Sequence, residues 1–157
     1  MALGAWLVIA PDPRLFVLVP VWFALRMAFN AIDGMLAREF RQASRLGAYL
    51  NELTDVISDA ALYAPFALLP GSNPWLVAAI VVLSVISEMS GVMGLTVGSE
   101  RRYDGPMGKS DRAFVFAVVG LLAAFGVPLA AALDWIWAGV IALLAFTIIN
   151  RVRRGLA

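Results

Sequence analysis

The sequence predicts an all-α fold: a polytopic membrane helix bundle with five full transmembrane helices and a partial one at the N-terminus. Three observations predict this fold. The 157-residue chain is 62% hydrophobic and 15% charged, with a mean hydropathy of +0.86, which is well above the apolar share of a soluble domain. It contains five apolar stretches of about 20 residues, the length with which a helix crosses a hydrocarbon layer roughly 30 Å thick. Clusters of Pro, Gly, Asn and Asp separate most of these stretches and predict turns.

The first ten residues, MALGAWLVIA, are apolar, but ten helical residues reach only about 15 Å. They lack the basic segment and the cleavage site of a signal peptide, so we interpret them as the end of a helix in a chain truncated at its N-terminus. The full helices are then predicted over residues 14–38, 46–69, 74–97, 112–133 and 135–150, with turns at PDPR, PGSNP and YDGPMG. No repeat or linker divides the chain, so residues 1–157 are predicted to form a single domain.

The basic residues indicate an orientation. Ten of the twelve Lys and Arg residues lie in the segments 38–45, 101–112 and 151–154. With the five predicted helices, all three segments fall on one side of the membrane, and only Arg14 falls on the other. Because Lys and Arg accumulate in cytoplasmic loops, we expect this side and the C-terminus to be cytoplasmic.

Six ionisable side chains lie within the predicted helices, away from their ends: Arg26, Asp33, Glu52, Asp55, Asp59 and Glu88. At roughly 3 kcal/mol each in the centre of a bilayer, they would together cancel the stability of a typical domain if they faced lipid. Helical spacing places Arg26, Asn30, Asp33 and Ala37 on one face, and Asn51, Asp55 and Asp59 on one face of the next helix. The short connection makes these helices antiparallel neighbours, so we expect their polar faces to meet just below the cytoplasmic surface.

The chemistry open to this cluster is limited because the chain has no Cys and no His. Disulfides, thiolate sites and the commonest general base are therefore excluded. Converging carboxylate and amide oxygens suit Mg²⁺, Mn²⁺ or Ca²⁺ rather than Zn²⁺. The alternative is that the acids pair with Arg26 or form hydrogen bonds across helices as packing contacts, but one arginine cannot balance three aspartates.

The spacing of these residues resembles a known signature. From residue 30 to residue 55 the sequence reads N-x2-D-G-x2-A-R-x8-G-x3-N-x3-D. This is similar to D-x2-D-G-x2-A-R, eight or nine residues, then G-x3-D-x3-D, the pattern of the CDP-alcohol phosphotransferase (CDP-alcohol phosphatidyltransferase) family. GPMGKSDR resembles the Gly-Lys loop before the family's fifth helix, and the helix count fits its six-helix fold. LGAYLNELTDVISDAALYAPF and YDGPMGKSDRAF resemble a bacterial inner-membrane branch of the family.

The resemblance implies a metal-dependent enzyme of phospholipid biosynthesis. It would transfer a phosphatidyl or other substituted phosphate group from a CDP-linked lipid, such as CDP-diacylglycerol, to an alcohol acceptor with release of CMP. The resemblance also implies Mg²⁺ or Mn²⁺ as one or two bound cations, contact with membrane lipids, a homodimer, and an active site that faces the cytoplasm. Nucleic acid is not an expected partner.

The resemblance also implies roles for individual positions. The metal would be held at Asn30, Asp33, Asn51 and Asp55, and the catalytic residues would be Asp33 and Asp55, the latter as a ligand or as the general base. Positions that bind the nucleotide and its phosphates would be Gly34, Ala37, Arg38, Gly47 and Lys109. Gly34 and Ala37 leave room for the nucleotide, Arg38 assists at the phosphates, and Gly47 permits close approach.

The chain departs from the family pattern at two positions. Asn30 and Asn51 replace the first and third aspartates, so the motif carries two negative charges where the family has four. Asn oxygens coordinate Mg²⁺ without charge, so metal affinity should fall. Asp59 lies one turn beyond Asp55 on the same face. Our hypothesis is a rearranged site that uses Asp33, Asp55 and Asp59.

Two other classes of protein stay open. The first is a non-catalytic homologue that binds a nucleotide-lipid without turnover, which the two Asn residues favour. The second is a small membrane transporter with an ion path through Arg26, Asp55, Asp59 and Glu88. A transporter needs acids spread across the membrane depth, whereas most of these cluster toward one side.

Simpler roles are expected for several other residues. Arg26 is expected to pair with Glu88 or Asp59, and no role is assigned to Glu88. Lys109 and Arg112 either follow the charge asymmetry alone or contact a phosphate. Small residues at Ser87, Gly91, Gly94 and Gly98 predict helix packing seams. Aromatic residues near helix ends predict interfacial anchors: Trp75, Tyr103, Trp135 and Trp137.

Overall fold

The computed structural model describes residues 1–10, 12–39 and 45–157, without the side chains at positions 30, 31, 33, 34, 36–39 and 45. In these ranges the chain forms six α-helices and three short 3-10 helices, and no strand. The α-helices are α1 (Ala2–Ile9), α2 (Leu18–Glu39), α3 (Arg45–Tyr63), α4 (Pro74–Met93), α5 (Lys109–Ala124) and α6 (Leu133–Gly155). The 3-10 helices are Pro13–Val17, Ala64–Leu68 and Gly94–Val97. The all-α fold predicted from the sequence is confirmed.

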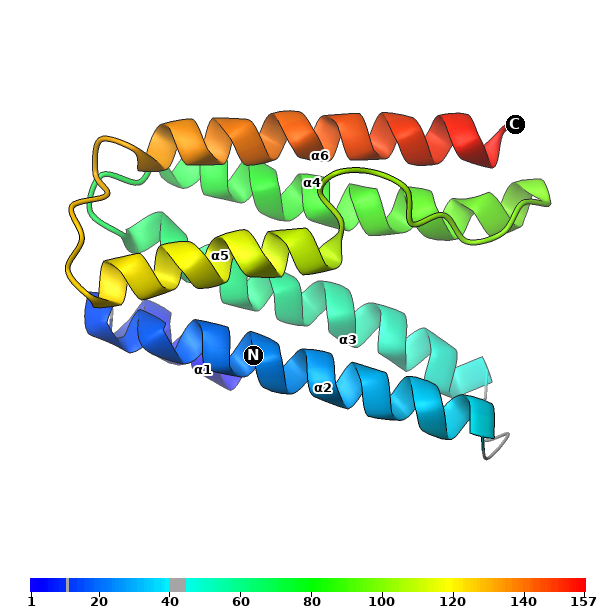
Figure 1. Cartoon of the computed structure of the whole chain (residues 1–157), viewed down its shortest axis with the longest axis horizontal. Coiled ribbons are helices and arrows are strands. Elements are labelled where there is room, and N and C mark those ends of the chain that lie inside the picture. Colours follow the sequence, from blue (N-terminus) through cyan, green and yellow to red (C-terminus); the bar gives the residue numbers. More distant parts are fainter. Residues whose placement is uncertain (11, 40–44) are drawn as a thin grey trace.

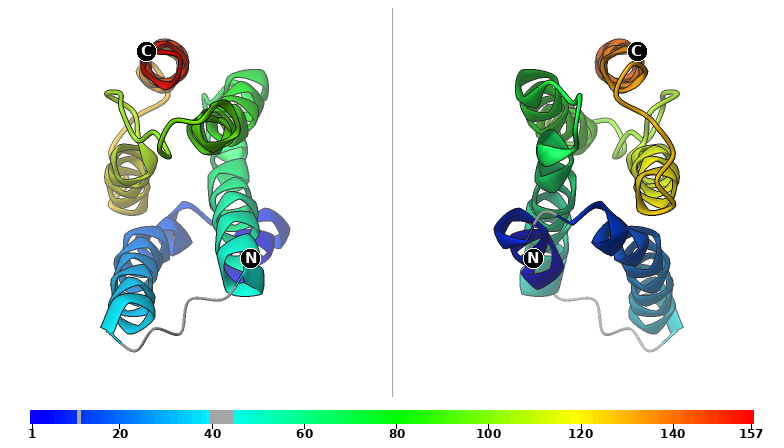
Figure 2. Two further views of the ribbon diagram at one scale, coloured as in Figure 1. Left: turned by 90° about the vertical axis from the view of Figure 1, so that its right-hand side faces the viewer. Right: turned by 90° about the vertical axis from the view of Figure 1, so that its left-hand side faces the viewer.

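The helices run along one long axis and form two layers (Figure 1). End-on views show α6, α5 and α2 in one layer and α4, α3 and α1 in the other (Figure 2). α4 packs on α6 across the layers, α5 packs on α2, and α3 packs on α4. α2 and α3 are antiparallel, as their short connection predicts.

Three segments lie at the same end of the bundle, on the right of Figure 1. They are the paired ends of α2 and α3, the connection between α4 and α5, and the C-terminal end of α6. We call this the basic end, because Arg101, Arg102, Arg153 and Arg154 belong to these segments. The described residues of the segments 101–112 and 151–154, which the charge pattern assigns to one side of a membrane, therefore lie at the same end of the bundle as the facing ends of α2 and α3.

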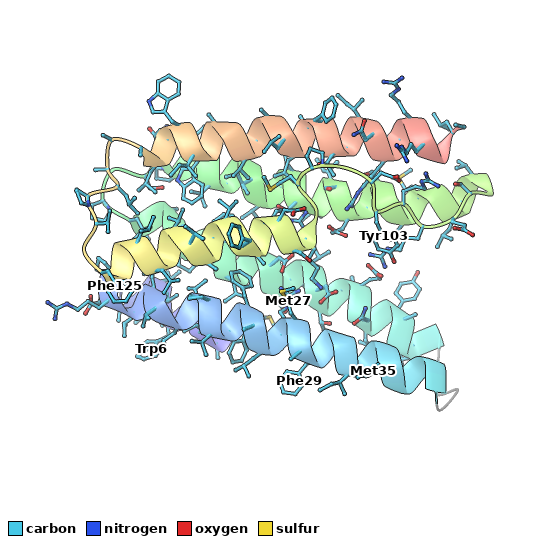
Figure 3. The ribbon with its side chains drawn as sticks, viewed as in Figure 1. Trp6, Met27, Phe29, Met35, Tyr103 and Phe125 are labelled. Carbon is cyan, nitrogen blue, oxygen red and sulfur yellow. The ribbon has the colours of Figure 1, made fainter. Side chains whose placement is uncertain are left out.

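The surface of the bundle suits a lipid environment. Two helical segments, Pro74–Val97 and Leu133–Gly155, are long and apolar enough to cross a membrane. Large apolar side chains point away from the bundle, among them Trp6, Phe29 and Phe125, which are 49%, 62% and 78% exposed (Figure 3). Such a density of exposed apolar groups is unusual for a soluble monomer.

Several predicted helix boundaries were wrong. The helix predicted over 46–69 is α-helical only to Tyr63, and the one predicted from residue 14 begins as a 3-10 helix up to Val17. α5 ends at Ala124 rather than near residue 133, because Gly126 adopts a left-handed φ of +73° just beyond the helix end. α6 continues to Gly155 rather than stopping at residue 150. Arg153 and Arg154 lie in its last turn, where positive charge stabilises the helix dipole.

An aromatic column forms the centre of the core. Tyr63 stacks on Phe116 with centroids 4.1 Å apart, and Phe116 stacks on Trp137 at 5.0 Å. Phe66 meets Phe116 edge-on at 4.8 Å. These contacts join α3, the 3-10 helix that follows it, α5 and α6 in one packed core.

The expectation that Trp137 anchors the bundle at a membrane interface was wrong. Its side chain is fully buried, and its indole N–H donates to the Ser72 hydroxyl at 2.9 Å. A buried indole needs such a partner. Trp75 and Trp135, by contrast, are more than 80% exposed.

The glycines at the end of α4 make room mainly for a loop. A Cβ at Gly91 would lie 2.5 Å from the Arg102 carbonyl oxygen, and one at Gly94 would lie 2.6 Å from the Glu100 carbonyl oxygen. The Arg102 N–H donates to the Gly91 carbonyl at 3.0 Å. The segment after α4 is thereby held against the helix, and this fixes the position of Arg101.

Candidate active site

Arg26 joins the polar faces of α2 and α3. Its Nη2 donates to the carbonyl oxygen of Asp55 at 2.8 Å and to the carboxylate Oδ1 at 2.9 Å. Its Nη1 pairs with Asp59 Oδ1. The expectation that Arg26 pairs with an acid is confirmed, with Asp59 rather than Glu88 as the partner and with Asp55 in addition.

Arg112 forms a second, deeper junction. Its side chain is fully buried at the first turns of α5, and its Nη2 donates to Glu88 Oε1 at 2.9 Å and to Asp59 Oδ2 at 3.5 Å. Asp59 therefore faces an arginine with each carboxylate oxygen and is only 4% exposed. A metal ion could reach it only by displacing one of these arginines.

A polar pocket of about 430 Å³ lies toward the basic end. It is lined by residues of α3, α4, α5, α6 and the connection between α4 and α5: Asn51, Glu52, Asp55, Glu88, Arg101, Tyr103, Gly105, Gly108, Lys109, Ser110, Asp111 and Arg151. Lys109 pairs with Asp55 Oδ2, and Arg101 pairs with Glu52. The pocket thus combines acids from α3, α4 and α5 with cations from the connection after α4, from α5 and from α6.

The outer part of the polar pocket carries Arg101 and Tyr103. The Arg101 guanidinium carbon lies 4.9 Å from the centroid of the Tyr103 ring, within the range of a cation–π contact. Tyr103, 67% exposed, lies on the connection between α4 and α5 near the basic end (Figure 3). Arg151 enters from α6, with its Nη1 3.6 Å from Glu88 Oε1.

A second, less polar pocket of about 270 Å³ adjoins the first. We call it the side pocket; its lining is Phe23, Arg26, Met27, Asp59, Lys109, Ser110 and Ala113. Lys109 and Ser110 line both pockets. Met27, 52% exposed, extends from α2 on the side of α5 (Figure 3). A less polar pocket and a charged pocket therefore lie on two sides of Lys109 and Ser110.

The structure brings together part of the predicted site. Asn51, Asp55 and Lys109 line the polar pocket, and Asp59 lines the side pocket. Gly47 lies in the first turn of α3. The remaining predicted positions lie on α2, but their side chains are outside the described residues: Asn30, Asp33, Gly34, Ala37 and Arg38.

The described donors suit one divalent cation better than two. Among the side chains that the structure describes, no three acidic residues converge as a metal site. Asn51 and Asp55 offer amide and carboxylate oxygens on one face of α3, which is the donor chemistry that Mg²⁺ and Mn²⁺ prefer. Asp55 already meets Arg26 and Lys109, so a cation at this carboxylate would replace the flexible lysine.

Sequence reasoning counted Arg101 and Arg151 only as basic-segment residues and missed their place in the pocket. A signal existed for Arg151, because Val140, Leu144, Thr147 and Arg151 are buried in α6 at the 3–4-residue spacing of a single helical face. This spacing predicts that Arg151 points inward. Nothing in the sequence indicates that Arg101 pairs with Glu52, because the path of the connection after α4 sets that contact.

Comparisons with known proteins place this chain in a family. Inner membrane protein YnbA of Escherichia coli is 46% identical over 150 residues, which cover 96% of this chain and 75% of YnbA. Archaetidylinositol phosphate synthase of Aeropyrum pernix is 30% identical over 132 residues, covering 84% of this chain and 65% of that protein. No solved structure matches the chain. The profile of the CDP-alcohol phosphatidyltransferase family matches residues 1–149, so the resemblance seen in the motif is confirmed and the chain belongs to this family.

Proposed function

We propose that this protein transfers a phosphatidyl group from CDP-diacylglycerol, or a related CDP-linked lipid, to a phosphorylated alcohol with release of CMP. Family membership supports the general reaction. The observation that carries the proposal is the boundary between the two pockets, where Lys109 and Ser110 belong to both. A CDP-linked lipid has an apolar lipid part and a charged diphosphate, so it needs a less polar pocket next to a charged one.

The donor is proposed to lie across this boundary. Phe23, Met27 and Ala113 give the side pocket an apolar wall suited to the lipid part. The diphosphate would then lie beside Lys109, whose ammonium already holds an anionic partner in Asp55. Lysine binds phosphate as a compact point charge, so Lys109 can exchange its carboxylate partner for a phosphate.

The acceptor is proposed to enter the polar pocket and to carry a phosphate of its own. Arg101 and Arg151 line this pocket, and each has a buried Nε without a hydrogen-bond partner among the described residues. Arginine groups with spare donors suit a phosphate. The name of the Aeropyrum pernix relative, archaetidylinositol phosphate synthase, points to the same chemistry for that protein.

Asp55 is proposed as the general base. Its carboxylate lies in the polar pocket, and once Lys109 turns to the diphosphate, its Oδ2 can accept the proton of the acceptor hydroxyl. The acceptor oxygen then bonds to the phosphorus of the phosphatidyl group while the phosphoanhydride bond to CMP breaks. Arg26 holds Oδ1 throughout and fixes the direction of the carboxylate.

Mg²⁺ or Mn²⁺ is proposed to bind at Asp33 and Asp55, with Asn30 and Asn51 as neutral donors. Such a cation would neutralise charge that develops on the departing phosphate. Asp59 is proposed to position Arg26 and Arg112 rather than to bind metal, because both of its oxygens meet arginines. This changes the role that the sequence hypothesis gave to Asp59.

The protein is proposed to be a multi-pass protein of the bacterial inner membrane, with the basic end and the C-terminus in the cytoplasm. The relative YnbA is named as an inner membrane protein, and the basic segments share one end of the bundle, which suits the charge asymmetry of cytoplasmic loops. A homodimer is proposed on the family resemblance alone.

A second candidate is a family member that binds the CDP-lipid without turnover. The pairing of Asp55 with both Arg26 and Lys109 favours it, since two neighbouring cations make a carboxylate a weaker proton acceptor.

Product analysis separates the two candidates. Purified protein in lipid nanodiscs is given CDP-diacylglycerol, Mg²⁺, and either a polyol or its phosphate ester, and CMP and the lipid product are measured. The proposal expects CMP together with a new phospholipid, and a preference for the phosphate ester. Tight CDP-lipid binding without CMP would identify the non-catalytic homologue.

A further inference from the structure

The carboxylates of the site are already balanced by cations of the same chain. Five described acids line the two pockets: Glu52, Asp55, Asp59, Glu88 and Asp111. Asp111 accepts a hydrogen bond from the Gly108 N–H. The basic residues paired with the other four are Arg26, Arg101, Lys109, Arg112 and Arg151. Because buried charges must be compensated, a site with this balance does not suit two additional divalent cations.

Arg26 and Lys109 share Asp55 but differ in how firmly they are held. Arg26 meets Oδ1 and the backbone carbonyl of Asp55 and also Asp59, and its side chain is 13% exposed. Lys109 meets Oδ2 alone in the described contacts, and its side chain is 30% exposed. An incoming cation at Asp55 would therefore displace Lys109 and leave Arg26 in place.

The two Asn residues that replace motif aspartates fit a site with one divalent cation rather than two. Asn30 and Asn51 remove two negative charges relative to the family pattern, which is the charge of one divalent cation. Arg26 adds a fixed positive charge between Asp55 and Asp59. A second cation near Asp55 would meet this guanidinium within a few ångströms and be repelled.

We propose that Arg26 takes the place of one of the two divalent cations, so that each chain binds a single divalent cation. The inference rests on the metal position assigned under the proposed function. Its test counts bound metal and does not depend on turnover, so either proposal can fail without the other.

The experiment titrates Mn²⁺ into the full chain in nanodiscs of zwitterionic lipid and follows free Mn²⁺ by electron paramagnetic resonance. The expected result is one Mn²⁺ per chain at saturation. Two Mn²⁺ of comparable affinity, or none, would overturn the proposal. The number of Mn²⁺ bound by the unaltered chain tests the single-cation proposal even if the Arg26 and Lys109 variants do not fold.

Two variants, each of which removes one positive charge beside Asp55, test whether Arg26 has this role. Arg26→Gln is expected to bind a second Mn²⁺. The Kd of this second ion should be at least about tenfold lower than the Kd of any second Mn²⁺ that the unaltered chain binds. Lys109→Gln also removes one positive charge from Asp55, but it should leave the count at one and only tighten the first Mn²⁺. Arg14→Gln, far from the site, should change neither. An unchanged count in folded Arg26→Gln, or a second Mn²⁺ in Lys109→Gln, would show that Arg26 has no such role.

Discussion

Arg26 of α2 is joined to Asp55 of α3 by two hydrogen bonds, one to the carbonyl oxygen at 2.8 Å and one to Oδ1 at 2.9 Å. The same guanidinium pairs with Asp59. The contact fixes the proposed base in one orientation and holds the two helices of the motif together. In a bilayer this pairing also removes the cost of placing three separate charges in hydrocarbon.

Arg112→Gln should destabilise the fold strongly. Arg112 is fully buried and pairs with Glu88 and Asp59, so its removal leaves two acids without their shared cation. A loss of about 3–5 kcal/mol is expected, measured as a lower unfolding midpoint by tryptophan fluorescence in nanodiscs. Arg153→Gln, the same change at an exposed position of α6, should stay within about 0.5 kcal/mol. Equal shifts in the two variants would contradict a structural role for the Arg112 junction.

Gly91→Ala should loosen the loop that carries Arg101. The added Cβ would lie 2.5 Å from the Arg102 carbonyl oxygen, and such overpacking costs about 1–3 kcal/mol. The matched change in α6, Gly139→Ala, meets no atom of the described residues within 4 Å and should be neutral or stabilising by up to about 1 kcal/mol. Hydrogen exchange of residues 98–108 should rise in the first variant only. Unchanged exchange there would mean that the glycine does not hold the loop.

Arg101→Gln should reduce the preference for a phosphorylated acceptor. Its guanidinium lines the polar pocket, and loss of a charged hydrogen bond to phosphate is worth about 1.5–3 kcal/mol. The ratio of kcat/KM for the phosphate ester to that for the free polyol should fall at least about tenfold. Arg102→Gln is the control, because Arg102 pairs with Asp104 and does not line the pocket. If the ratio held in Arg101→Gln, the acceptor phosphate would have to bind elsewhere.

The sequence predicted the helices well because hydrophobic length and turn residues are local signals. The meeting of α2 and α3 was also predictable, since Arg26, Asp55 and Asp59 lie on helical faces joined by a short connection. The partners of Glu88 were not predictable. Glu88 meets Arg112 and Arg151, and both contacts depend on how α4 packs against α5 and α6.

The role of Asp59 shows a limit of motif reasoning. Spacing places it beside Asp55 on α3, which made it a reasonable metal ligand. Its pairing with Arg26 and Arg112, which reach it from two other helices, argues against a role as a metal ligand. Local spacing gives the face of a helix, but the charge that meets that face comes from tertiary packing.

The most direct test of the account compares CMP release by the unaltered chain, Asp55→Asn and Asn51→Ala, with CDP-diacylglycerol, Mg²⁺ and a phosphorylated polyol in nanodiscs. If Asp55 is the base, Asp55→Asn should lower kcat by at least about 100-fold, while CDP-lipid binding is retained. Asn51→Ala, which removes only a neutral donor, should raise the Mg²⁺ requirement and leave most of kcat at saturating Mg²⁺. CMP release at an unaltered rate in Asp55→Asn would contradict the central claim.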